Sequence, residues 1–244
     1  MFLTTGEFFI IKSLMIELTK RNTGDKFYGR RKGKSLSPAM QERFDSILPK
    51  ISIAKGDSQL NKDVLFKDKS ELWLEIGFGG GEHLSKTAQN NPEVGLIGCE
   101  PYINGMAKLL RDISELELEN ILLYNDDARH IMDRLEDDSI SRAFALFGDP
   151  WRKYRHRYRR FISPNNLDRL SRILKSGAIL RIATDHPIYL QWIMKWATIH
   201  PDFDWIDNNP DDWSVRKPDW YETRYEQKAI REGRKPYYFT FKRK

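Results

Sequence analysis

The 244-residue sequence predicts an α/β fold, with a mostly parallel sheet and helices on both of its faces. From about residue 70 onward, short strand-like segments alternate with segments in which apolar residues recur at helical spacing. This alternation is typical of strand–helix–strand units. Each strand candidate is also nearly continuous in apolar and β-branched residues, as expected where helices cover both faces of a parallel sheet.

The predicted elements follow one another in regular alternation. Strands are expected over 71–78, 94–100, 120–126, 140–149 and 177–184, and helices near 81–90, 102–116, 127–136, 164–175 and 186–199. In the last of these helices, Ile188, Trp192 and Trp196 recur at helical spacing, which indicates packing against the core. A sixth strand over 202–208 and an aromatic strand over 235–244 close the chain.

The composition argues against several classes of protein. No window approaches the roughly 18 uncharged apolar residues that span a bilayer, and Lys12 interrupts the apolar opening. We therefore expect neither a membrane protein nor a signal peptide, and Met15 is an alternative start. Cys99 is the only cysteine, which rules out a disulfide framework and a cysteine-rich zinc site. We expect no metal and a cytoplasmic location.

The net charge of +6 is unevenly distributed. Residues 20–34 carry seven bases and one acid, residues 151–160 six bases and no acid, and residues 214–244 ten bases and four acids, so each segment sums to +6 and the remainder to −12. A single basic run is often only solvated surface, but three runs interleaved with aromatic residues predict contact with a polyanion. We interpret residues 1–35 as a partly flexible basic arm and residues 36–244 as one domain.

The most specific local pattern is ELWLEIGFGGGEHL, a strand that runs through a glycine-rich turn into a helix. Such a turn lets backbone N–H groups approach a ligand, and the helix N-terminus adds positive potential. A dinucleotide-binding fingerprint would need glycine where Glu82 stands, which argues against a nicotinamide-dependent oxidoreductase. From Glu75 to Gly81 the residues spell ExGxGxG, which resembles the first motif of the S-adenosylmethionine-dependent methyltransferases.

Acids also stand at the ends of the second and third strands. Glu100 follows Gly81 by nineteen residues, where one strand–helix–strand unit places an acid that can bind ribose hydroxyls. Alternatively, Glu100 could simply lie next to the N-cap of the helix that follows. The third strand ends in NDDA, where Asp127 and Ala128 are the expected neighbours of an adenine ring and Asp126 is a close competitor. Asp at a helix start is also commonly a cap.

Asp149 ends the fourth strand, at the edge where an open parallel sheet places its active site. Directly after it come Pro150, Trp151 and the densest basic run of the chain. An acid, an aromatic residue and six cations so close together are typical of a site that presents a nucleic-acid base to a cofactor.

Together these motifs resemble the bacterial tRNA (guanine-N7-)-methyltransferase family. The resemblance extends from about Lys26 to the C-terminus, through LEIGFGGGEHL, GCEP, NDDA, DPWRKYRHRYRR, IATDHPIY and ETRYEQKAIREGR. It implies a Rossmann-like class I methyltransferase fold with a seven-stranded sheet, S-adenosyl-L-methionine as the cofactor and tRNA as the partner. The implied reaction is methyl transfer to N7 of guanosine 46 in the tRNA variable loop, by a monomer or a homodimer.

The resemblance also implies roles for individual residues. Asp149 is the implied catalytic residue, and segment 214–244 binds the substrate. The implied cofactor contacts are Glu75, Gly77, Gly79, Gly81, Glu100, Asp127, Ala128 and Asp149, and the implied substrate contacts are Lys153, Asp185, Thr223, Arg224, Tyr225 and Glu226. The chain departs from the family pattern at Gly148, Arg152 and Arg224; Gly148 replaces a common proline, which predicts a more mobile loop.

The implied chemistry needs no general base, because guanine N7 carries an in-plane lone pair and no hydrogen. The enzyme has to align the two reactants and stabilise the charge that develops. Asp149 or Asp185 could orient the guanine by accepting hydrogen bonds from its N1–H and N2–H. Trp151, Tyr154 and Tyr158 could stack on bases or simply pack. The predicted contacts to tRNA phosphates are Arg30, Arg31, Lys32, Lys153, Arg155, Arg157, Arg159 and Arg160.

Two rival functions were weighed. The first is a methyltransferase that acts on another substrate, such as a protein or a small molecule. Methyltransferases of adenine and glutamine amino groups usually carry a PPY-type tetrapeptide after the fourth strand, where this chain has GDPW, which argues against that subgroup. A non-catalytic RNA-binding module would have lost the acids at the strand ends, which are all present here.

Overall fold

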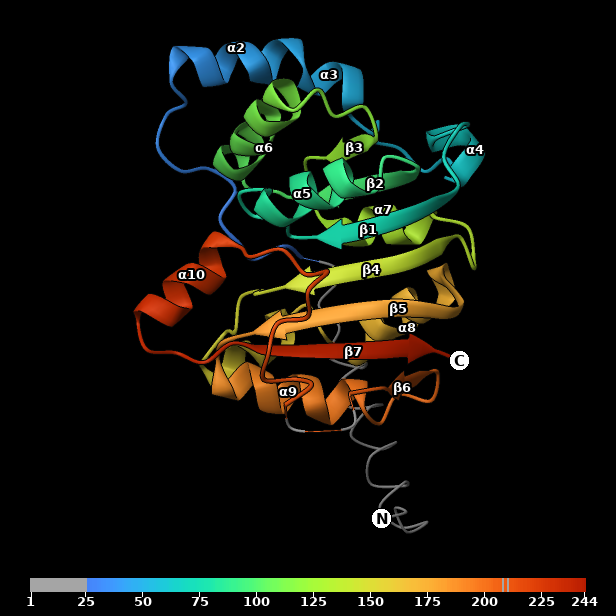
Figure 1. The fold of residues 1–244 in the computed structure, drawn as a ribbon, viewed down its shortest axis with the longest axis vertical. Coiled ribbons are helices and arrows are strands. Elements are labelled where there is room, and N and C mark those ends of the chain that lie inside the picture. The colour runs from blue at the N-terminus through green and yellow to red at the C-terminus, as the bar shows by residue number, and fades with distance from the viewer. Residues whose placement is uncertain (1–25, 208, 210) are drawn as a thin grey trace.

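A single seven-stranded sheet organises the chain in the computed structural model, which describes residues 26–207, 209 and 211–244 (Figure 1). The strand order is β3-β2-β1-β4-β5-β7-β6. Strands β1 to β5 are parallel, and β7 runs antiparallel to both β5 and β6. The strands are β1 (Glu71–Ile76), β2 (Val94–Cys99), β3 (Ile121–Tyr124), β4 (Ile140–Leu146), β5 (Leu174–Thr184), β6 (Phe203–Trp205) and β7 (Tyr237–Arg243). The predicted mostly parallel, seven-stranded sheet is confirmed.

Five helices follow strands β1 to β5 along the chain, as predicted. They are α5 (Glu82–Asn90), α6 (Ile103–Glu115), α7 (Ala128–Arg134), α8 (Pro164–Ile173) and α9 (Pro187–Ala197). The remaining helical elements have no counterpart among the predictions. They are α2 (Pro38–Ser46), α3 (Leu48–Ile51), α4 (Lys62–Leu65), the 3-10 helix η1 (Tyr154–Arg159) and α10 (Arg224–Arg231).

Strand β5 starts earlier than the predicted 177–184. Leu174 already pairs with Ile140, but the regular register with β4 resumes only where Ile179 pairs with Arg142. The intervening residues include Gly177, whose φ of 80° lies in the left-handed region that glycine tolerates. The hydrophobic pattern of the sequence does not predict this irregularity. As a result, β5 is longer than expected and the helix predicted over 164–175 is shorter.

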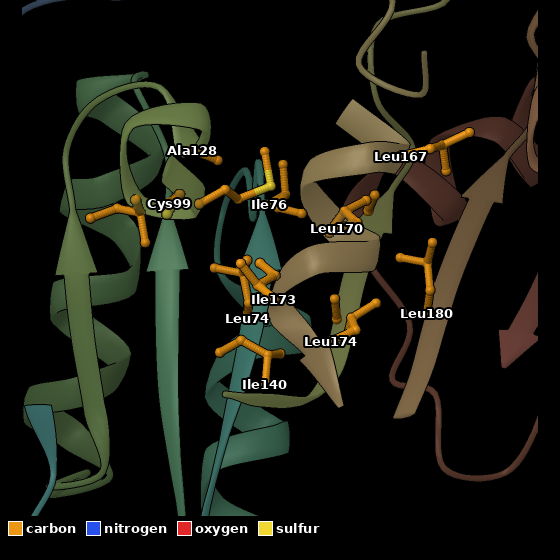
Figure 2. Packing of buried hydrophobic residues seen from close by; sticks show 14 of the residues in the cluster. Leu74, Ile76, Cys99, Ala128, Ile140, Leu167, Leu170, Ile173, Leu174 and Leu180 are labelled. Carbon is orange, nitrogen blue, oxygen red and sulfur yellow. The ribbon is translucent and has the colours of Figure 1, made fainter. Parts of the chain in front are cut away.

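The core consists of two hydrophobic layers, one on each face of the sheet. Leu74 and Ile76 of β1 face α8, where Leu170 and Ile173 complete the first layer (Figure 2). Trp73, directly before Leu74 in sequence, belongs to the second layer with residues of α5 and α6. Alternation along the strand separates the two layers, because successive side chains point to opposite faces. Helices therefore cover both faces, as predicted.

The topology determines where a ligand can bind. From β1 the chain proceeds outward through β2 and β3 and then returns to β4 on the other side of β1. In such a sheet, a crevice forms at the carboxyl ends of the two strands where the direction of winding reverses. Those ends point toward α10 and the chain segment before α2 (Figure 1). Among the helices of the described residues, none has the length and apolar character to cross a membrane.

Candidate active site

A cavity of about 530 Å³ opens at the carboxyl ends of β1, β2 and β4, where the winding reverses. Its volume is in the usual range for small-molecule sites. Buried residues at the strand ends, Ile76, Cys99 and Leu146, line part of it. Each basic segment also contributes to its lining: residues 26–30, residues 151 and 158–160, and Tyr225. Three segments distant in sequence thus meet at one site.

The glycine-rich turn forms one wall of the cavity. Gly77 and Gly79 line it with φ of 67° and 61°, and a Cβ on Gly77 would meet no protein atom within 4 Å. A Cβ on Gly79 would lie 2.9 Å from the ring of Tyr225, which therefore covers this backbone closely. Gly81 is not part of the lining; a Cβ there would lie 2.7 Å from Leu109, so this glycine serves the packing of α5 against α6.

Glu100 fastens this turn to the end of β2. Its Oε2 accepts a hydrogen bond from the Gly79 N–H at 2.7 Å, and its Oε1 accepts one from the Tyr102 N–H at 2.9 Å. Burial raises the pKa of the carboxyl, and the two N–H groups oppose this shift. Glu75 lies beneath the turn instead; it is buried, bonds His83 Nδ1 through Oε2 at 2.7 Å, and does not line the cavity.

The two aspartates after β3 have different surroundings. Asp127 lines the cavity together with Ala128. It also caps α7, because its Oδ1 accepts the Arg129 N–H at 3.0 Å, and its carboxylate pairs with the Arg129 guanidinium. Asp126 does not line the cavity. The geometry therefore favours Asp127 over Asp126 as the neighbour of a bound ligand.

Asp126 instead attaches the N-terminal segment to the sheet. Arg31 Nη2 contacts Oδ1 and Lys55 Nζ contacts Oδ2, both at 2.7 Å. Burial acts to raise the pKa of Asp126, but the hydrogen bonds from Lys55 and Arg31 outweigh it and lower the pKa to about 2. Arg31 is thus engaged in an ion pair within the protein.

Replacing Asp126 by asparagine is expected to destabilise the protein by about 1 kcal/mol at neutral pH, since both cations are exposed and screened. Because the folded-state pKa of about 2 lies below the usual value of 3.8, the carboxylate stabilises the fold above pH 3.8. This contribution disappears as the pH falls toward 2. Urea unfolding should therefore show a larger difference between wild type and variant at about pH 6 than at about pH 3. An equal difference at both would contradict the assignment.

Asp149 lines the cavity with no partner for its carboxylate among the described residues. Burial by the cavity walls raises its pKa. The loop around it is strained, since Phe147 and Trp151 have φ of 53° and 42°. Strained non-glycine residues on either side of an acid are typical of functional loops.

Arg160 has a structural role within the protein, and its predicted contact with a phosphate stays a prediction. Its guanidinium donates to the carbonyls of Pro150 and Trp151 at 2.8 and 3.1 Å, and the residue is only 5% exposed. It stabilises the loop that follows Asp149. Two of the five N–H donors of this guanidinium are thus used within the protein, while Arg160 also borders the cavity.

The remaining predicted phosphate contacts are more accessible. The guanidinium of Arg159 lies 4.4 Å from the ring centroid of Tyr28 and 4.9 Å from that of Trp151, at the cavity wall. Arg157 stacks on Tyr154 and Tyr158 at 3.9 and 4.1 Å. The exposed cations are Arg30, Lys32, Lys153 and Arg155.

The predicted C-terminal motif forms the start of α10. Thr223 is its N-cap, with Oγ1 accepting the Glu226 N–H at 3.1 Å. Glu226 is buried and accepts a hydrogen bond from Tyr238 Oη at 2.7 Å. Arg224 pairs with Glu82 at 2.6 Å, beside the glycine-rich turn. Of the four motif residues, only Tyr225 lines the cavity.

Asp185 also lies outside the cavity lining, where it pairs with Arg234. Gly148, by contrast, is part of the lining and has room for a side chain, since a Cβ would lie 3.7 Å from Tyr189. The more mobile loop expected from this glycine stays a prediction. No sequence motif predicted several other lining residues, among them Tyr28, Tyr102, Arg129, Tyr189 and Trp192.

Comparison with known proteins agrees with this geometry. Residues 69–239 match a family described as "Putative methyltransferase". A tRNA (guanine-N(7)-)-methyltransferase from Ruegeria sp. (strain TM1040) is 47% identical over 89% of this chain and 87% of its own length. The protein of the same name from Roseobacter denitrificans is 48% identical over 89% and 95%. That from Agrobacterium fabrum is 43% identical over 94% and 100%.

Among solved structures, the 16S rRNA methyltransferase KamB superposes with a TM-score of 0.50 and 15% identity, over 76% of this chain and 95% of its own. The antibiotic-resistance methyltransferase Kmr gives 0.50 and 14%, over 79% and 97%. These likenesses concern the fold alone, which is the predicted class I methyltransferase fold. The relatives show more: the chain belongs to the tRNA (guanine-N(7)-)-methyltransferase family.

Proposed function

We propose that this protein transfers the methyl group of S-adenosyl-L-methionine to N7 of guanosine 46 in the variable loop of tRNA. The observation that carries the proposal is the position of Asp149. Its carboxylate stands in the cavity at the switch point of the sheet, where three basic segments meet. The substrate class follows from the family to which the chain belongs.

The residues of the cavity fit this cofactor. S-adenosyl-L-methionine, when bound, supplies an electrophilic methyl group on a positively charged sulfur. Gly77 and Gly79 offer a wall of backbone without side chains, which suits the methionine part. Glu100 is placed to accept hydrogen bonds from ribose hydroxyls, and Asp127 with Ala128 borders the space for adenine. Glu75 and Gly81 support this wall from behind.

Asp149 orients the guanine in this proposal. Between the two candidate carboxylates, Asp149 lines the cavity without a partner among the described residues, whereas Asp185 is paired with Arg234. A carboxylate that accepts the guanine N1–H and N2–H fixes the direction of the N7 lone pair. Its negative charge also favours the positive charge that develops on the ring during methylation. No proton has to be removed.

The tRNA backbone is proposed to lie against the exposed cations on either side of the cavity. Arg30, Lys153 and Arg155 are exposed there, and Trp151 with Tyr28 offers aromatic rings at its wall. The affinity for tRNA should fall with salt, with a slope in log affinity against log salt of about 0.7 to 0.9 per phosphate contact. A tRNA substrate and the single cysteine also favour a cytoplasmic location.

The experiment that tests the proposal is methylation of bulk tRNA with a labelled methyl donor, followed by nucleoside analysis. We expect the label in 7-methylguanosine. A tRNA transcript in which guanosine 46 is replaced by adenosine is the matched control, and it should accept no label. Label in another nucleoside would contradict the proposed chemistry, and equal label in the control transcript would contradict the proposed position.

A further inference from the structure

A second cavity, of about 600 Å³ and more open than the first, lies on the outer side of α6. Basic side chains dominate it: Arg30, Lys32 and Lys34 come from the N-terminal segment and Lys108 comes from α6. None of the described residues in its lining is acidic. We call this feature the α6 groove. Among these cations, Lys34 belongs to the basic segment 20–34 but was not a predicted phosphate contact, and Lys108 lies outside the three basic segments.

The N-terminal segment is held along α6 by backbone contacts. The Ile103 N–H donates to the Arg31 carbonyl at 2.9 Å, so this helix amide is already used within the protein. Asn104 binds the segment twice, since its Oδ1 accepts the Gly33 N–H at 2.8 Å and its Nδ2 donates to the Lys34 carbonyl at 2.7 Å. The backbone that carries Lys32 and Lys34 is thus fixed beside the helix that carries Lys108.

This close approach requires glycine at position 33. A Cβ on Gly33 would lie 2.3 Å from Tyr102 Oη and 2.7 Å from Asn104 Oδ1. A side chain there would force the segment away from the helix or displace both partners. The absence of a side chain therefore determines the spacing between the cations on the two sides of the groove.

The cations of the α6 groove lack counter-charges. Among the described residues, no carboxylate lies within ion-pair distance of Lys32, Lys34 or Lys108. Partial burial lowers the pKa of Lys108, and Arg224 acts in the same direction; the opposing acid, Glu82, is itself paired with Arg224 at 2.6 Å. Like charges that line one groove repel one another, and a bound anion would relieve this repulsion.

We propose that Lys32, Lys34 and Lys108 bind a phosphate of the tRNA backbone at a site separate from the cavity that holds the guanine. The inference rests on the proposed function for the identity of the polyanion. Arg30 and Tyr102 line both cavities, so the α6 groove continues directly from the reaction site. An open, basic groove with this continuity suits a strand that extends beyond the reacting nucleotide, because each phosphodiester of that strand carries one negative charge that these cations attract.

The test is direct binding of fluorescently labelled tRNA, in the presence of saturating S-adenosylhomocysteine, to the Lys34→Ala/Lys108→Ala double variant. We expect the dissociation constant to rise about tenfold and the salt slope to decrease by about one phosphate contact, roughly 0.7 to 0.9. Lys175→Ala is the matched control, because Lys175 is exposed at the amino end of β5, whereas the cavity lies at the carboxyl ends of the parallel strands. The control should bind as the wild type does.

A second variant tests the geometry without removing charge. Gly33→Ala should weaken tRNA binding while the affinity for S-adenosylhomocysteine, measured by calorimetry, stays within about twofold of wild type. Lys108→Arg should keep most of the affinity. If the double variant binds tRNA with the affinity and salt slope of Lys175→Ala, the α6 groove is not a phosphate site. That result leaves the proposed function intact, since wild-type methylation of tRNA is measured separately.

Discussion

Replacing Asp149 by asparagine is expected to lower kcat/KM for tRNA methylation by on the order of 100- to 1000-fold. Asparagine keeps the size of the side chain but presents an amide N–H₂ where the guanine N1–H or N2–H needs an acceptor. It also removes the negative charge that opposes the charge developing on the guanine ring. The cofactor should still bind, because Gly77, Gly79 and Glu100 form its wall independently of Asp149.

The measurement is single-turnover methylation together with calorimetry of cofactor binding. Asp57→Asn is the matched control, since Asp57 is an exposed aspartate between α3 and α4 and should leave the rate unchanged. Normal turnover by the Asp149 variant would refute its orienting role. Loss of cofactor affinity alone, with a normal rate at saturation, would show that Asp149 serves the cofactor instead.

Asp149 should also determine how the rate depends on pH. Burial raises its pKa, so the carboxylate becomes protonated at a higher pH than an ordinary aspartate does. Because the charged form is the active one, kcat/KM should fall as the pH drops through this raised pKa. The wild type should therefore lose activity at a higher pH than an ordinary aspartate would require, whereas the residual activity of Asp149→Asn should change little with pH.

Much of this site could be predicted from the acidic residues that follow the carboxyl ends of the strands. The rule that parallel strands present their carboxyl ends at one edge places Glu100, Asp127 and Asp149 together, and all three line the cavity. The rule does not say on which side of the sheet a side chain lies. Glu75 alternates with Leu74 and Ile76, which face α8, and it therefore points the other way, toward His83 of α5.

The contacts that bring distant segments together could not be predicted from the sequence. Asp126 binds Arg31 and Lys55 across 95 and 71 positions, and no periodicity records such pairs. Two missed helices did have local signals. Ser37 caps α2 directly before a proline at its first position, and Thr223 with Glu226 has the spacing of a capping box at α10. The helix-capping residues could therefore be identified from the local sequence, whereas the ion pairs between distant segments could not.

Replacing Glu100 by glutamine should raise the dissociation constant for S-adenosylmethionine by about 10- to 100-fold. The carboxylate accepts the N–H groups of Gly79 and Tyr102, one on each oxygen. Glutamine keeps only one acceptor oxygen, so its amide N–H₂ must face one of these N–H groups. The glycine-rich turn then loses a link to β2, and the hydrogen bonds proposed for the ribose hydroxyls lose their charge assistance.

Calorimetry of cofactor binding checks this expectation, with Glu119→Gln as the matched control at an exposed glutamate before β3. The ligand-free variant should lose at most about 1 kcal/mol in its free energy of unfolding, because burial of the charged carboxylate is itself unfavourable and glutamine removes that cost. A large loss of cofactor affinity with little loss of stability therefore identifies a ligand contact. If the variant is strongly destabilised and yet binds the cofactor as tightly as Glu119→Gln does, Glu100 only shapes the turn.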